Sequence, residues 1–182
     1  MKTQSTALYI LRLALTLLII TGVMAALLAA VNLVTAPIIA GLQAEKTQQA
    51  IQAVLPGGGE EIAFTDKTGT VSTVYGSDTG YAVEVAPIGF DGAITMMVGI
   101  DKDGNVLGIS IISHTETAGL GAVAAAKTSA GENFRGQFVG LNGSVAVSKD
   151  GGTVEAITGA TITSRAVCEG INAALACVAD LG

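Results

Sequence analysis

The segment from Thr158 to Ser164 has the residue types best suited to hold a phosphorylated ligand. It reads Thr-Gly-Ala-Thr-Ile-Thr-Ser and precedes a stretch expected to be helical from about Ser164 to Val178. Small residues let a ligand approach the backbone, and the start of a helix offers free N–H groups and the positive end of its dipole to a phosphate. The simpler alternative is a helix N-cap formed by Thr163 or Ser164, because hydroxyl side chains are common at that position.

A second candidate is the loop from His114 to Gly121, which reads His-Thr-Glu-Thr-Ala-Gly-Leu-Gly. Glu116 and Thr117 offer polar groups to a ligand, and Leu120 can lie against a flat ring. Gly119 permits backbone angles that other residues rarely adopt. The alternative is an ordinary turn between a strand and a helix. The chain has one histidine, with no cysteine near it in sequence, so no metal site is predicted.

The N-terminal part of the chain is predicted to cross a membrane. Half of the 182 residues are hydrophobic and the mean hydropathy is +0.61, which is too apolar for an ordinary soluble domain. No charged residue lies between residues 13 and 44, and residues 13–34 alone are long enough to span a hydrocarbon core as a helix. A cleaved signal peptide is the alternative, but its hydrophobic part normally runs only about 7–15 residues.

The flanking charges and prolines predict how the chain is divided. Lys2 and Arg12 precede the apolar stretch, so the positive-inside rule places the N-terminus in the cytoplasm. Pro37 marks an expected bend, and Pro56 with the glycines after it ends a second helix. We therefore expect a cytoplasmic N-terminus (1–12), a transmembrane helix (13–36), a juxtamembrane helix and linker (37–59) and an extracytoplasmic domain (60–182).

That domain is expected to be α+β, with an antiparallel sheet. Alternating apolar residues predict strands at 71–75, 80–87, 93–100 and 106–113, and two more strands are predicted near 144–147 and 153–156. Asp103-Gly104 predicts a hairpin, and apolar residues on both faces of 106–113 predict a central strand. Short helices are expected near 123–129 and around Phe134 and Phe138. The elements do not alternate as βαβ units do, which favours α+β.

Composition and cysteine spacing exclude several classes of function. A net charge of −6, a pI near 4.6 and the lack of tryptophan argue against nucleic-acid binding, which needs a basic face. Cys168 and Cys177 fall nine residues apart in the predicted last helix, a rise of roughly 13 Å. They cannot form a disulfide there, and we expect two buried thiols.

Taken together, these segments resemble the G subunits of the Rnf electron-transport complex, within the FMN-binding domain family. The resemblance covers nearly the whole chain. It rests on the N-terminal anchor, Gly80-Tyr81, Gly89-Phe90-Asp91-Gly92, the 114–121 loop and the Thr-Gly-Ala-Thr segment with its following helix. Two positions depart mildly from the family pattern, which usually has Asp at Glu155 and Pro at Ala118.

The resemblance implies that a flavin transferase attaches FMN to Thr161 as a phosphoester. It also implies that Thr158, Gly159, Ala160 and Thr163 shape the backbone around the phosphate and the ribityl chain, whereas the loop from Glu116 to Leu120, with Thr117 and Gly119, borders the ring. No catalytic acid or base and no metal ligand is implied, because the flavin supplies the redox chemistry.

The function that the resemblance implies is electron transfer in a membrane complex. The complex would couple reduced ferredoxin and NAD⁺ to Na⁺ or H⁺ translocation, and this chain would be its single-pass, FMN-carrying subunit in the bacterial inner membrane, beside other membrane and peripheral subunits. The alternatives are the C subunit of the Na⁺-translocating NADH:quinone oxidoreductase, an exported FMN-binding sensor, and an anchored domain without a cofactor.

Overall fold

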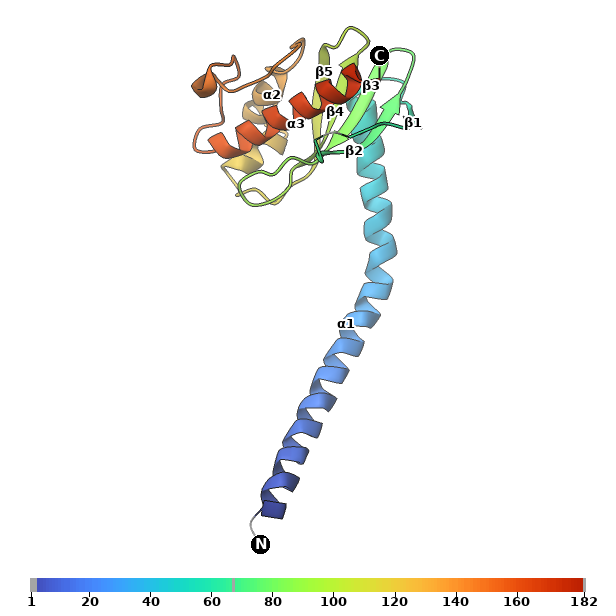
Figure 1. Cartoon of the computed structure of the whole chain (residues 1–182), viewed down its shortest axis with the longest axis vertical. Helices are drawn as coiled ribbons and strands as arrows, with labels where there is room; N and C mark the ends of the chain where they lie inside the picture. The colour runs from blue at the N-terminus through green and yellow to red at the C-terminus, as the bar shows by residue number, and fades with distance from the viewer. Residues whose placement is uncertain (1–2, 67, 182) are drawn as a thin grey trace. The chain divides into compact units, whose positions relative to one another are not determined.

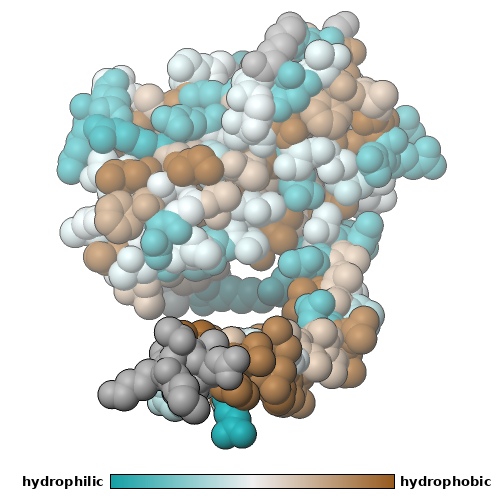
Figure 2. Space-filling model, turned by 60° about the horizontal axis from the view of Figure 1, so that its bottom comes forward, coloured by the Kyte–Doolittle hydropathy of each residue, from teal (hydrophilic) through white to brown (hydrophobic). Residues whose placement is uncertain are grey.

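A single long helix, α1 (Thr3–Val54), begins the part of the chain that this computed structural model describes, residues 3–66 and 68–181. Pro37 lies inside α1, so the segments expected on either side of this proline belong to one helix. By length and composition, the stretch of α1 from Leu8 to Val54 contains a segment apolar enough to cross a membrane. All side chains from Leu8 to Val34 are exposed, and the part of α1 that is visible in Figure 2 is mostly hydrophobic.

Contacts within the chain divide it into two units, Met1–Glu45 and Lys46–Gly182. The last turns of α1 therefore belong to the second unit, where Ile51, Val54 and Leu55 are buried against a sheet. They pack on Ala82 and Met97. The helix ends at Val54, just before Pro56 and the glycines after it, as the sequence predicts.

The second unit is built on a five-stranded antiparallel sheet in which spatial order follows sequence order (Figure 1). Its strands are β1 (Glu60–Ile62), β2 (Val71–Gly76), β3 (Gly80–Val85), β4 (Thr95–Asp101) and β5 (Val106–Ser113). The predicted hairpin joins β4 to β5, and Gly104 adopts a φ of 82° in its turn. The Asp101 carboxylate closes this turn by accepting the N–H groups of Asp103 and Asn105 at 2.9 and 2.8 Å.

The prediction that residues 106–113 form a central strand is wrong, because β5 lies at the edge of the sheet. Its outer side is partly occupied at one end, where Val106 exchanges backbone hydrogen bonds with Gly140 and Leu141. The apolar residues on both faces of β5 reflect packing above and below the sheet, where Ile109 belongs to one core and Ile112 borders the other.

The main core lies between the sheet and α3 (Thr161–Ala179), on the face opposite the end of α1. Alternation along the strands separates the two faces, since Val83 and Val85 point into this core while Ala82 points at α1. From α3 the core receives Val167, Ile171 and Ala174. It also contains Phe134 and Phe138, whose rings meet edge to face at 5.3 Å.

The short elements of the domain differ in detail from the predictions. The alanine-rich helix is a 3₁₀ turn, η1 (Gly121–Ala125), and α2 (Ser129–Gly136) ends before Phe138. The strands expected near 144–147 and 153–156 reduce to one parallel bridge between Val147 and Val154, on either side of η2 (Ser148–Asp150). The α+β class and the antiparallel sheet are confirmed, and Cys168 and Cys177 are free and buried.

Candidate functional site

The first turn of α3 is open at its N-terminus. The helix begins at Thr161, three residues earlier than predicted, and Ala160 occupies the N-cap position without a side-chain cap. The N–H groups at the start of a helix have no acceptor within the helix. In α3 the N–H of Ser164 is the first to find one, the Ala160 carbonyl at 3.0 Å. The turn therefore presents unused donors and the positive end of a 19-residue helix.

The predicted alternative, an N-cap by Thr163 or Ser164, is wrong because both residues lie within the helix. The Ser164 hydroxyl donates to the Ala160 carbonyl at 2.9 Å and accepts the Ile157 N–H at 3.0 Å. These bonds fold the 157–160 turn tightly onto the helix. The hydroxyl of Thr161, by contrast, makes no such bond to the turn, and Thr161 lines a pocket.

A pocket of about 340 Å³ opens beside this turn. It is lined by parts of four separate segments of the chain: Phe90, Glu116, Thr117, Leu120, Gly121, Lys149, Gly159, Ala160, Thr161, Ile162 and Thr163. Seven of the nine residues proposed from the sequence are among them. The other two, Gly119 and Thr158, line a neighbouring pocket beside α2, together with Glu155 and Gln137.

Glu116 ties three of the four segments together. Its side chain is buried, with 7% of its surface exposed. One carboxylate oxygen accepts the N–H groups of Phe90 and Asp91 at 2.8 and 3.1 Å, and the other accepts the hydroxyl of the buried Thr163. With both oxygens in use, Glu116 acts as a structural tie of the pocket wall rather than a free ligand group.

Two glycines make room for this carboxylate. A Cβ atom added at Gly89 or at Gly121 would overlap with an oxygen of Glu116. At Gly121 it would also lie 2.5 Å from the Thr163 hydroxyl oxygen. The glycine at each position is therefore required by the close approach of the backbone to Glu116.

Lys149 supplies the positive charge of the pocket. Its Nζ donates to the Thr161 hydroxyl oxygen at 3.4 Å. The next residue, Asp150, forms a two-bond ion pair with Arg165 of α3, with N–O distances of 2.6 and 2.7 Å. Hydrogen bonding to Arg165 holds the pKa of Asp150 below its usual value. Sequence analysis missed Lys149, which lies in a short polar turn twelve residues before Thr161.

Part of the pocket lining is apolar and exposed. Phe90, Leu120 and Ile162 line the pocket with 67%, 44% and 51% of their surfaces exposed. Large exposed apolar side chains at a concave site are typical of a surface that covers a ligand or a partner. The pocket thus combines a cation and a hydroxyl, at Lys149 and Thr161, with exposed apolar side chains, which suits a ligand with an anionic group and a flat ring system.

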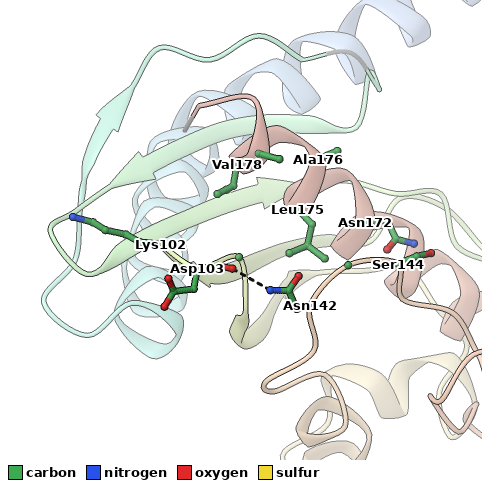
Figure 3. Close-up of a pocket in the computed structure, with 11 residues that line it drawn as sticks. Lys102, Asp103, Asn142, Ser144, Asn172, Leu175, Ala176 and Val178 are labelled. Atoms are coloured by element: carbon green, nitrogen blue, oxygen red, sulfur yellow. Dashed lines mark hydrogen bonds between the residues drawn. The ribbon is translucent and has the colours of Figure 1, made fainter.

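The domain also has a larger hollow, of about 680 Å³, between the β4–β5 hairpin and the end of α3. Figure 3 shows that Lys102 and Asp103 lie apart at its rim, and that Asn142 donates to the Asp103 carbonyl, at 3.0 Å. Its charged groups do not converge on one point. Among the described residues, no group of three or more His, Cys, Asp or Glu side chains is placed to hold a metal ion.

Comparison with known proteins identifies the family. The FMN-binding domain family matches residues 89–176, which contain all four segments of the pocket. The G subunit of the ion-translocating oxidoreductase complex of Methanosarcina acetivorans is 34% identical over 173 residues, covering 88% of this chain and 89% of that protein. The chain belongs to the G-subunit family of ion-translocating oxidoreductase complexes.

Two further relatives show that G subunits occur in complexes that translocate different ions. The G subunit of the proton-translocating ferredoxin:NAD⁺ oxidoreductase complex of Clostridium ljungdahlii is 33% identical, covering 82% of this chain and 80% of its own. The G subunit of the Na⁺-translocating ferredoxin:NAD⁺ oxidoreductase complex of Acetobacterium woodii is 34% identical, covering 88% and 87%. The predicted resemblance is therefore confirmed, and G-subunit membership alone does not specify the coupling ion.

Proposed function

We propose that this chain carries one FMN joined to Thr161 by a phosphoester and relays electrons as a subunit of an ion-translocating ferredoxin:NAD⁺ oxidoreductase complex. The observation that carries the proposal is the position of the Thr161 hydroxyl. It lies at the uncapped start of α3, inside the pocket and 3.4 Å from the Lys149 ammonium.

The residues around the Thr161 hydroxyl fit a phosphate. Backbone N–H groups and a helix dipole attract an anion, and Lys149 adds a full positive charge. Gly159 and Ala160 have no side chain that would block access to the backbone. Gly159 adopts a φ of 77°, and an added Cβ would lie 3.0 Å from Leu120, so a larger residue there would also press on the apolar wall.

The apolar lining residues fit a flat aromatic system. Leu120, Phe90 and Ile162 offer apolar surface, and Thr117 adds a hydroxyl. When bound, the flavin supplies the electron chemistry, and the protein supplies position and polarity. Glu116 then serves by fixing the turn that carries Phe90 against the first turn of α3.

Attachment requires a flavin transferase and an activated donor, because direct condensation of a hydroxyl with a phosphate in water is unfavourable. We expect a flavin phosphoanhydride, in which the FMN phosphate is joined to a second phosphate. The Thr161 oxygen forms a bond to the FMN phosphorus, the phosphorus–oxygen bond to the second phosphate breaks, and the hydroxyl proton passes to the base or leaving group. The protein gains one FMN and loses the equivalent of one water.

A covalent link suits the location that we propose for the domain. The chain would be a single-pass protein of the bacterial inner membrane, with its N-terminus in the cytoplasm and residues 60–182 on the extracytoplasmic side, beside the other membrane and peripheral subunits. A domain outside the cytoplasm has no access to the cytoplasmic FMN pool. A phosphoester prevents loss of the cofactor by dissociation.

The test is the intact mass of the full chain after co-expression with a flavin transferase, compared with that of Thr161→Val. The wild type should gain the mass of one FMN less one water, and Thr161→Val should gain nothing. Thr153→Val is the matched control, because Thr153 is an exposed threonine outside the pocket, and it should be loaded like the wild type. An unloaded wild type would overturn the proposal, and loading of Thr161→Val would overturn the choice of residue.

A further inference from the structure

Lys149 is the one basic side chain among the residues that line the pocket. The other charged lining residue is Glu116, whose carboxylate is buried and bonded on both oxygens. A phosphate that enters the pocket therefore meets a single ammonium group, and this group already touches the Thr161 hydroxyl.

An ion pair fixes the position of the turn that carries Lys149 relative to α3. Asp150 holds Arg165 through two charged hydrogen bonds, and a paired geometry of this kind fixes direction as well as distance. Arg165 follows Thr161 by four residues, so the two side chains lie one above the other on the helix. Two adjacent residues of η2 thus contact two residues of α3 that lie one helical turn apart: Lys149 contacts Thr161, and Asp150 contacts Arg165.

Further contacts hold the segment before and after this turn. The Asn172 carboxamide of α3 accepts the Val145 N–H and donates to the Val145 carbonyl, both at 2.8 Å. After the turn, Gly152 lies so close to the Ala146 backbone that a Cβ would overlap with it. The backbone on either side of Lys149 is therefore fixed, although the Lys149 side chain itself is exposed.

We propose that Lys149 binds the phosphate of the flavin donor and positions it for attack by the Thr161 oxygen. The inference rests on the proposed attachment at Thr161 and adds the residue that controls its rate. The ammonium group lies where negative charge develops as the Thr161 oxygen bonds to phosphorus and the anhydride oxygen leaves. Once the link has formed, the same group stands beside the single negative charge of the phosphodiester.

The experiment measures the initial rate of mass gain of the full chain with purified flavin transferase, using flavin adenine dinucleotide as the phosphoanhydride donor. The variants are Lys149→Met, which keeps the length of the side chain and removes the charge, and Lys149→Arg, which keeps the charge. Lys102→Met is the matched control, because Lys102 lies at the rim of the other hollow (Figure 3). Thermal unfolding of each variant before loading checks the fold.

We expect Lys149→Met to be loaded about ten- to a hundredfold more slowly, the range of one charged hydrogen bond. The loading rate of Lys149→Arg should stay within a few fold of the wild-type rate, and that of Lys102→Met should equal it. Raising the salt concentration should reduce the difference in rate between the wild type and Lys149→Met. Equal rates for Lys149→Met and the wild type would overturn this inference while leaving the attachment at Thr161 intact. If Lys149→Arg were loaded as slowly as Lys149→Met, the positive charge would not be what positions the phosphate. A wild type that is never loaded would instead overturn the proposed function.

Discussion

Glu116 is the residue whose removal should loosen the pocket most. Its carboxylate is the shared acceptor for the N–H groups of Phe90 and Asp91 and for the Thr163 hydroxyl. Glu116→Ala would leave all three donors without this acceptor. Glu116→Gln keeps one oxygen for the two N–H groups, but it loses the charge and turns an amide group toward Thr163.

The size of the effect follows from the exposure of the three donors. A buried donor that loses its acceptor costs about 1–3 kcal/mol. Thr163 is 1% exposed and should incur the full cost, whereas Phe90 and Asp91 are exposed residues whose N–H groups can turn partly to water. We therefore expect Glu116→Ala to lower the unfolding free energy by about 2–4 kcal/mol, and Glu116→Gln by roughly half as much.

Thermal unfolding of the full chain in detergent measures this loss, which corresponds to a fall in Tm on the order of 10 °C for Glu116→Ala. Glu169→Ala, which removes an exposed acid from α3, is the control and should change stability by less than about 0.5 kcal/mol. A Glu116→Ala protein that unfolds at the wild-type temperature would refute the view that this carboxylate ties the pocket together.

Two further predictions concern the core. Gly99→Ala should cost about 1–3 kcal/mol by overpacking, because its Cβ would lie 2.9 Å from the Val54 carbonyl carbon at the end of α1. Gly108→Ala, at the cross-strand partner position with open space around it, should be nearly neutral, and equal Tm values for the two would contradict this reasoning. Burial raises the pKa of the Cys168 thiol to about 11, so alkylation followed by peptide mapping should be slow at pH 8 and accelerate toward pH 11. Alkylation of native Cys168 at pH 8 as fast as in urea would show that the thiol is not protected.

Four of the five strands of the sheet and its hairpin could be predicted because their signals are local, whereas the three-residue edge strand β1 (Glu60–Ile62) was not predicted. Asp103-Gly104 defines the hairpin, and alternating residues define β3 and β4. The segment near 144–147 misled the prediction, since Val145 and Val147 are buried as in a strand. The backbone partner of Val145 is a side chain, the Asn172 carboxamide from α3, and no local pattern reveals such a pairing.

The site was predictable where its residues are adjacent in sequence. Thr161 and the 114–121 loop carry recognisable motifs, and the structure brings most of the residues proposed from them into one pocket. Lys149, Phe90 and Ile162 were missed as site residues. Lys149 reaches the pocket through tertiary contacts, because the Asp150–Arg165 pair and the Asn172–Val145 hydrogen bonds hold its segment against α3.

The order of the elements along the chain has a consequence for biogenesis. In the β1–β5 meander each strand pairs with its neighbour in sequence, so the sheet can assemble progressively as synthesis proceeds. Its main apolar face stays uncovered until residues 161–179 have emerged, because α3 supplies the other half of that core. Thr161 begins the same helix. The hydroxyl is therefore presented in its pocket only when the core closes, so that a transferase requiring this geometry would act on folded chains and leave unfinished ones without flavin.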